Sequence, residues 1–131
     1  MATVVVNGGL DITTNRIKGA GTEPLNIGWG TGAGTAVVGD STLFTEKLVD
    51  LTTSAGTDHT VGTSSRVTTI LTNDTYQVTG TRTATGAGTV TNAGLFDAAS
   101  GGNLYMKGDF TGIGLGSGDS IAFTIKVIYD N

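Results

Sequence analysis

Apolar and polar residues alternate most regularly near the C-terminus, between Asp119 and Asp130. The apolar residues at every second position are Ile121, Phe123, Ile125, Val127 and Tyr129. Successive side chains of a β-strand point to opposite faces of the sheet, so this period of two places the five on one face. The pattern predicts a central strand of the hydrophobic core.

A β-hairpin is predicted from Thr89 to Phe110. The apolar-bearing run Val90–Phe96 leads into Asp97–Gly102, and a second run from Leu104 to Phe110 follows. Asp and Ser side chains bond their own backbone, and paired glycines supply the positive φ that a chain reversal needs. The two runs are therefore expected to pair with each other through a longer loop.

Four more segments have the composition or alternation of strands. After the single proline, Leu25, Ile27 and Trp29 share one face of a short segment. The other three predicted strands are Leu10–Lys18, Ser65–Leu71 and Thr75–Ala84. In the last of these, Tyr76 and Val78 share a face with Arg82, whereas the opposite face is mostly Thr and Gln and suits a solvated β surface.

Two segments between these strands are less regular. Thr42–Leu51 is the one place where a helical turn is plausible, since Ser41 or Thr42 could cap it. Thr52–Ser64 is polar and is expected to form a loop.

The first nine residues are predicted to form an N-terminal arm or an edge strand, and residues 10–131 the sandwich domain. Val4, Val5 and Val6 precede the turn signal Asn7-Gly8-Gly9. These three valines could pair in the sheet or reach a neighbouring molecule, and they are the candidate interface residues.

Together these segments predict an all-β protein with a single domain of 131 residues. Seven or eight strands at roughly ten-residue spacing are typical of a β-sandwich, jelly-roll-like or Ig-like. The abundance of glycine, with 22 residues, favours many turns over helices. The residues predicted to form the core are Trp29, Phe96, Phe110, Ile121, Phe123, Ile125 and Val127.

Charge and composition argue against several classes of protein. The net charge is −4, and the seven basic residues are scattered, so nucleic-acid binding is not expected. The chain has no cysteine for disulfides and no apolar run near the ~20 residues of a membrane span. The N-terminus also lacks the pattern of a signal peptide.

Catalytic and cofactor motifs are weak. The single histidine, His59, lies in a polar stretch that predicts a solvated loop, and neither a Gly-x-Ser-x-Gly elbow nor a cysteine could supply a nucleophile beside it. The glycine-rich run Gly28–Gly34 is not followed by the helix that a nucleotide site needs. The dispersed carboxylates are explained by turns rather than by a calcium loop. We therefore predict no enzyme, no catalytic residue, no cofactor and no metal site.

Three segments carry a resemblance to a known group of proteins. They are Leu25–Gly32, Thr42–Glu46 and Asn92–Gly102, followed by Phe110 and Gly118-Asp119-Ser120. This pattern resembles one that recurs in virion structural proteins of tailed bacteriophages, and it extends over nearly the whole chain, from Ile12 to Tyr129. The motifs specify a β framework rather than an activity.

Within that group the chain is similar to capsid decoration (cement) proteins. It has no repetitive shaft and no coiled-coil heptads, which favours a compact domain over a fibre. The resemblance implies a homotrimer on the outer surface of the virion head, bound to the major capsid protein after synthesis in the host cytoplasm. The alternative is a tail or neck fibre or collar protein with a host- or glycan-binding role. For sugar binding, the candidate aromatic residues are Trp29, Tyr76 and Tyr105.

Overall fold

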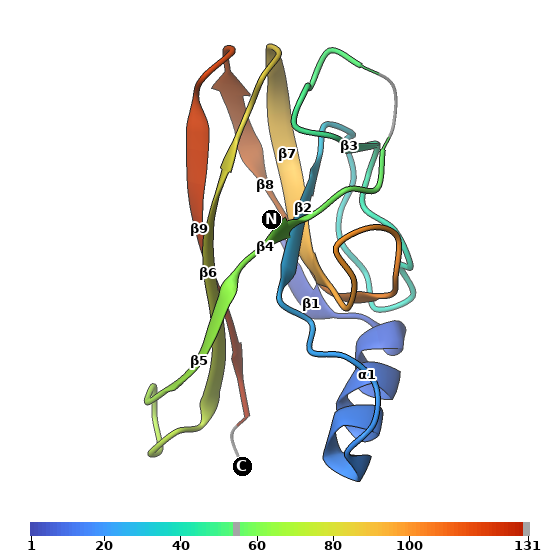
Figure 1. The fold of residues 1–131 in the computed structure, drawn as a ribbon, viewed down its shortest axis with the longest axis vertical. Helices are drawn as coiled ribbons and strands as arrows, with labels where there is room; N and C mark the ends of the chain where they lie inside the picture. Colours follow the sequence, from blue (N-terminus) through green and yellow to red (C-terminus); the bar gives the residue numbers. More distant parts are fainter. Residues whose placement is uncertain (54–55, 130–131) are drawn as a thin grey trace.

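The computed structural model describes residues 1–53 and 56–129 and shows two antiparallel β-sheets that face each other (Figure 1). The prediction of an all-β, single-domain β-sandwich is confirmed. The strands are β1 (Thr3–Val5), β2 (Asn26–Gly30), β3 (Glu46–Lys47), β4 (Thr60–Val61), β5 (Thr63–Val67), β6 (Thr75–Thr83), β7 (Gly88–Phe96), β8 (Leu104–Leu115) and β9 (Ser120–Ile128). One helix, α1 (Asn7–Lys18), is found among the described residues.

The larger sheet has the strand order β1-β8-β7-β2-β3, with β4 also paired to β2. The smaller sheet has the order β5-β6-β9. The loops around β3 lie on the side of the larger sheet that faces away from the smaller one (Figure 1). Helix α1 lies at the end of the larger sheet near the start of β2, and its Ile12 joins the core cluster that contains Val78 of the smaller sheet. The larger sheet is therefore covered on both faces, which explains why all five residues of β2 are buried.

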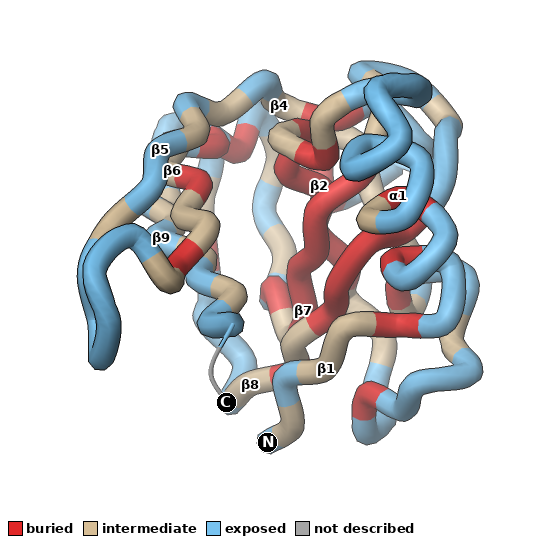
Figure 2. Tube along the Cα trace, turned by 90° about the horizontal axis from the view of Figure 1, so that it is seen from below, coloured by how far each residue is buried: buried red, intermediate tan, exposed pale blue. Residues whose placement is uncertain are grey.

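The predicted central hairpin is confirmed as β7 and β8. Leu95 lies opposite Met106 and Gly94 opposite Lys107, and the register shifts between Val90 and Asn92. On its other side β7 pairs with β2, where Gly28 lies opposite Gly94. Burial is concentrated along β2 and β7, two neighbouring inner strands of this sheet (Figure 2).

The predicted core residues divide into two groups. Trp29 and Phe96 are almost fully buried. The others are half-buried and pack against the clusters between the sheets: Phe110, Ile121, Phe123, Ile125 and Val127. Phe123 contacts both of these clusters, one around Ile27 and Leu95 and one around Trp29.

The C-terminal segment forms the predicted strand, but the prediction that this strand is central was wrong. Strand β9 pairs only with β6 among the described strands, so it is an edge strand. Its inward side chains are half-buried because no further strand flanks them. Tyr129 follows the strand and is 52% exposed, and Asp130 lies outside the described residues.

The strand predicted at Leu10–Lys18 was wrong, because this segment belongs to helix α1. The helix begins at Asn7 within the expected turn, so the predicted boundary at residue 9 falls inside it. Gly9 and Ile12, three positions apart, form its buried side. A Cβ at Gly9 would lie 2.1 Å from the Tyr105 carbonyl oxygen, so glycine lets the helix approach β8. Gly19, with φ of 89°, ends the helix in the left-handed conformation.

The helical turn predicted at Thr42–Leu51 was also wrong. Thr45 adopts a left-handed φ of 47°, which breaks a helix, and the next two residues form β3. The predicted loop Thr52–Ser64 contains β4 and the start of β5, and residues 54–55 lie outside the described residues. The other two predicted strands were confirmed: β6 matches Thr75–Ala84, and β5 covers the first part of Ser65–Leu71.

Candidate functional site

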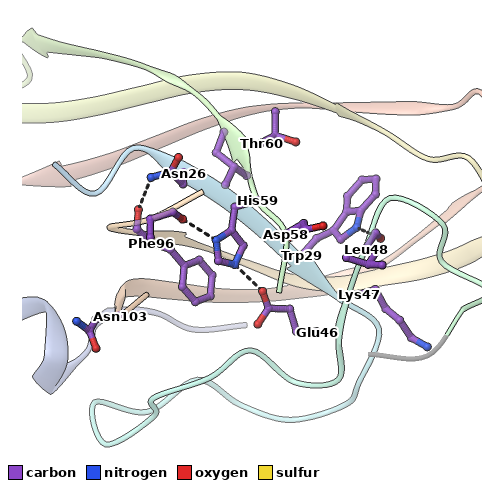
Figure 3. Close-up of polar contacts among 12 residues, drawn as sticks. Asn26, Trp29, Glu46, Lys47, Leu48, Asp58, His59, Thr60, Phe96 and Asn103 are labelled. Carbon is purple, nitrogen blue, oxygen red and sulfur yellow. Dashed lines mark hydrogen bonds and ion pairs between the residues drawn. The ribbon is translucent and has the colours of Figure 1, made fainter. Parts of the chain in front are cut away.

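The single histidine is buried, which corrects the prediction of a solvated loop residue. Its side chain has no exposed surface and stacks on Phe96, with ring centroids 3.9 Å apart and an angle of 12° between the planes. Figure 3 shows the imidazole between Glu46 and the backbone near Phe96. The burial of His59 could not be predicted, because its neighbours in the sequence are polar and lie in an exposed loop. No periodic pattern indicated that this one side chain points inward.

Both ring nitrogens of His59 face oxygen atoms. Nδ1 lies 2.8 Å from the Ala98 carbonyl oxygen, and Nε2 lies 2.6 Å from Glu46 Oε1. A carbonyl oxygen only accepts, so Nδ1 must carry a proton. A second proton then lies on Nε2 or on the Glu46 carboxyl, and either arrangement joins the two side chains. The pair fastens the loop that carries His59 to β3.

Arg82 is the second buried charged residue of this region. Its guanidinium donates to the Asp58 carbonyl oxygen at 2.8 Å and to Thr60 Oγ1 at 2.9 Å, and it lies 5.0 Å from the centre of the Trp29 ring. Burial lowers the pKa of Arg82 to about 10, which still leaves it charged at neutral pH. The residue joins the inner face of β6 to β4 and thereby links the two sheets. The prediction that it shares a face with Tyr76 and Val78 is confirmed, because Arg82 and Val78 are both buried and Tyr76 packs against the core cluster that contains Val78.

This buried cluster has the features of a structural bridge. The His59 side chain is closed to solvent, and its two nitrogens are both engaged within the chain. Among residues 1–53 and 56–129, no group of three or more His, Cys, Asp or Glu side chains is placed to hold a metal ion. In the same part of the chain, no helix has the length and apolar character needed to span a bilayer.

A surface pocket of about 400 Å³ lies between helix α1 and the smaller sheet. Its lining residues are Ile12, Thr13, Arg16, Ile17, Glu23, Pro24, Tyr76, Tyr105 and Tyr129. This volume is within the range of small-molecule sites. The three tyrosines of the chain therefore come together at one place, although they belong to β6, β8 and the segment after β9.

The tyrosines of this pocket support one another. The rings of Tyr76 and Tyr105 meet edge to face with centroids 6.2 Å apart, and the hydroxyl oxygens of Tyr105 and Tyr129 are 2.5 Å apart. Burial raises the pKa of both Tyr76 and Tyr105 above the usual value, so both keep their protons. Arg16 and Glu23 add one charge of each sign. The pocket thus has an aromatic and apolar lining with a few polar groups and no excess charge.

Of the three aromatic residues considered for sugar binding, two line this pocket and one does not. Tyr76 and Tyr105 are part of it, whereas Trp29 is fully buried between the sheets, where its Nε1 donates to the Leu48 carbonyl oxygen at 2.9 Å. Tyr129 was assigned from the sequence to the inner face of a strand and not to a binding site, and Arg16 was not singled out. Their contribution depends on the packing of α1 beside the smaller sheet, and the segment of α1 was predicted as a strand.

The N-terminal valines lie within the chain's own sheet. Val4 pairs with Lys107 and Val5 with Met106, as an edge strand beside β8. Val6 is 1% exposed and belongs to a buried cluster with Leu43, Phe96 and Leu104. Their surface available to another molecule is therefore limited to the half-buried Val4 and Val5.

The three segments that carry the resemblance meet on the larger sheet. Leu25–Gly32 contains β2 and Asn92–Gly102 contains the end of β7, and these two strands pair directly. The third segment is joined to both: Asn92 bonds the backbone of Phe44, and the Gly32 N–H donates to the Phe44 carbonyl oxygen at 3.0 Å. Segments that are distant in the sequence thus form one structural unit.

Comparisons with known protein families, with curated protein sequences and with solved structures found no significant match.

Proposed function

We propose that this chain is a structural protein of a tailed-phage virion that decorates the outside of the head and braces neighbouring subunits of the major capsid protein. The observation that carries the proposal is the convergence of the three resembling segments on β2, β7 and the Phe44 loop. Because the three segments meet in space, the residues that carry the resemblance belong to one part of the fold. This supports the resemblance, since a shared framework requires its motifs to lie together. The proposed role involves no catalytic step.

The stabilising mechanism is physical. An oligomer, a trimer by the resemblance, that touches several capsid subunits at once gains affinity because each further contact is intramolecular. Ligands that bind only the assembled shell stabilise it by mass action. The net charge of −4 helps to keep decorated particles apart in solution.

The direct test mixes the purified protein with undecorated heads of the phage that encodes it. We expect saturable co-sedimentation and a higher temperature of head disruption. Exposed apolar side chains at two loops offer a matched pair of variants, Val37→Ser with Val38→Ser and Ile70→Ser with Leu71→Ser. Loss of binding in one pair only would identify the loop that contacts the head. No binding by the folded wild-type protein would contradict the proposal.

The tyrosine-lined pocket favours a second candidate function, the binding of a neutral saccharide by a tail or collar protein. Aromatic rings offer apolar faces to a sugar ring, and Arg16 and Glu23 can donate to and accept from its hydroxyl groups without favouring an ionic ligand. A glycan array with the purified protein tests this function. Tyr129→Ala should abolish any signal, while Ile70→Ala, at an exposed position outside the pocket, should leave it unchanged. An array without signal would exclude this candidate.

A further inference from the structure

The outer edge of β9 is a long, regular and unpaired strand edge. Strand β9 pairs with β6 through nine consecutive residue pairs, from Ser120 opposite Thr83 to Ile128 opposite Thr75. In the described part of the chain no strand pairs with its other side. Native edge strands are usually protected by shortness, proline, bulges or several charges, and β9 carries only one charge, Lys126.

The hydrogen-bond pattern identifies which backbone groups are free. Tyr129 N–H donates to the Asp74 carbonyl oxygen, and Ala84 N–H donates to the Asp119 carbonyl oxygen. In an antiparallel pair, residues that exchange hydrogen bonds alternate with residues that do not. The odd-numbered residues of β9 therefore bond to β6, and the N–H and C=O groups of the even-numbered residues point away from it. These even-numbered residues are Ser120, Ala122, Thr124, Lys126 and Ile128, all with exposed side chains.

We propose that this edge binds the same edge of a second copy of the chain, in an antiparallel pairing across a two-fold axis at Thr124. Only this centre lets all five free residues of each copy pair, with Thr124 opposite Thr124, Ala122 opposite Lys126 and Ser120 opposite Ile128. The two smaller sheets then join into one sheet of six strands. A two-fold interface of this kind uses the same surface on both copies.

The side chains are self-complementary in this register. On the outer face, each Lys126 lies beside an alanine rather than beside the other lysine, so no like charges are opposed. On the inner face, Phe123 lies opposite Ile125 of the second copy, and Ile121 opposite Val127. All four are only half-buried in the single chain, so pairing covers apolar surface that the fold leaves in contact with water.

The proposed contact is a dimer, which differs from the trimer implied by the resemblance, and it does not depend on the proposed role on a phage head. Light scattering of the purified chain over a dilution series measures the mass directly. We expect a monomer–dimer equilibrium. A monomer at every concentration, or a trimer, would overturn the proposal.

A charge at the axis tests the location of the contact. Thr124→Lys places two lysines opposite each other and should raise the dimer dissociation constant by about tenfold or more. Thr81→Lys makes the same change on the same outer face, one strand further in, and should leave the constant unchanged. Both positions are exposed, so circular dichroism should show both variants folded. Equal effects of the two variants would overturn the location.

Cysteine cross-linking tests the register, because the chain contains no cysteine of its own. At the axis, hydrogen-bonded partners have Cα atoms about 5.5 Å apart, which suits a disulfide. Thr124→Cys should therefore form a disulfide dimer under mild oxidation. Ala122→Cys alone should not, because position 122 lies opposite Lys126 of the second copy, and four residues of strand, about 13 Å, separate the two introduced thiols. A mixture of the Ala122→Cys and Lys126→Cys variants, however, should form a disulfide between the two different variants. A dimer that shows the reverse pattern would contradict the pairing.

Discussion

The side-chain amide of Asn92 forms two hydrogen bonds with the backbone of Phe44. Its Oδ1 accepts from the Phe44 N–H at 3.0 Å, and its Nδ2 donates to the Phe44 carbonyl oxygen at 3.0 Å. Asn92 is fully buried on β7, and Phe44 lies in a loop 48 residues earlier in the chain. One side chain therefore satisfies both backbone groups of a loop residue and holds the loop against the larger sheet.

Replacing Asn92 should destabilise the fold. Asn92→Ala leaves the Phe44 N–H without its partner and the Phe44 carbonyl oxygen with only the Gly32 N–H. Asn92→Asp keeps only an acceptor, so the carbonyl oxygen then faces a carboxylate. We expect each variant to lose about 1–3 kcal/mol of unfolding free energy, with Asp the worse of the two. Urea denaturation measures the change. Asn15→Ala, on the exposed side of α1, is the matched control and should be nearly neutral.

Replacing Arg82 should destabilise the protein even when the new residue is lysine. Its guanidinium reaches the Asp58 carbonyl oxygen, the Thr60 hydroxyl and the Lys47 carbonyl oxygen from one planar group, and an ammonium cannot match that geometry. Arg82→Lys is expected to cost about 2–4 kcal/mol. Thermal unfolding compared with Arg66→Lys, at an exposed position on β5, measures the effect. Similar melting temperatures for the two variants would show that the buried network contributes little.

The sequence predicted best where a single local pattern decides the structure. The alternation in β9 and the turn residues between β7 and β8 were sufficient to locate those strands along the sequence, although not to show that β9 lies at the edge of its sheet. The helix α1 was missed because its buried side consists of only Gly9 and Ile12. Leu10, which together with Ile12 suggested one face of a strand, is exposed. Its docking depends on a close approach to the Tyr105 backbone, which no local pattern encodes.

Buried polar residues were the other source of error. His59 and Arg82 are inside the protein because partners distant in sequence satisfy them, so burial could not be inferred from their neighbours along the chain. The pocket itself was not predicted, although two of its lining residues, Tyr76 and Tyr105, were named as candidates for sugar binding. Their meeting with Tyr129 and Arg16 follows from the packing of separate elements.

Acid should destabilise the turn between β5 and β6 through Asp74. Its carboxylate accepts hydrogen bonds from the backbone N–H groups of Leu71, Thr69 and Ile70, and these bonds hold its pKa well below the usual value. A lowered pKa in the folded state gives stabilisation that is complete above the ordinary value of about 3.9 and is lost as the pH falls below it.

Asp74→Asn should therefore reduce stability at neutral pH and flatten the acid dependence. Between about pH 4 and pH 2, unfolding of the variant should take up as much as one proton fewer than unfolding of the wild type. A remaining slope is expected, because the pKa values of Asp40 and Asp109 are also lowered by hydrogen bonds to backbone N–H groups. Urea titrations at several pH values measure the slope. Identical slopes for variant and wild type would contradict this role of Asp74.

Gly28 is expected to be required by packing rather than by any phosphate-binding loop. A Cβ at this position would lie 2.9 Å from His59 Cδ2 and 2.9 Å from Phe96 Cε2, the two stacked rings that cover β2. Gly28→Ala must push the rings apart or shift the strand, at a cost of about 1–3 kcal/mol.

Gly114→Ala on β8 is the matched control, since a Cβ there meets no atom within 4 Å and the added side chain also reduces the entropy of the unfolded chain. The expected order of melting temperatures is therefore Gly114→Ala at or above the wild type and Gly28→Ala below it. A Gly28→Ala variant as stable as the wild type would show that the His59–Phe96 stack can move, and that the outer layer of the larger sheet is less tightly packed than its contacts indicate.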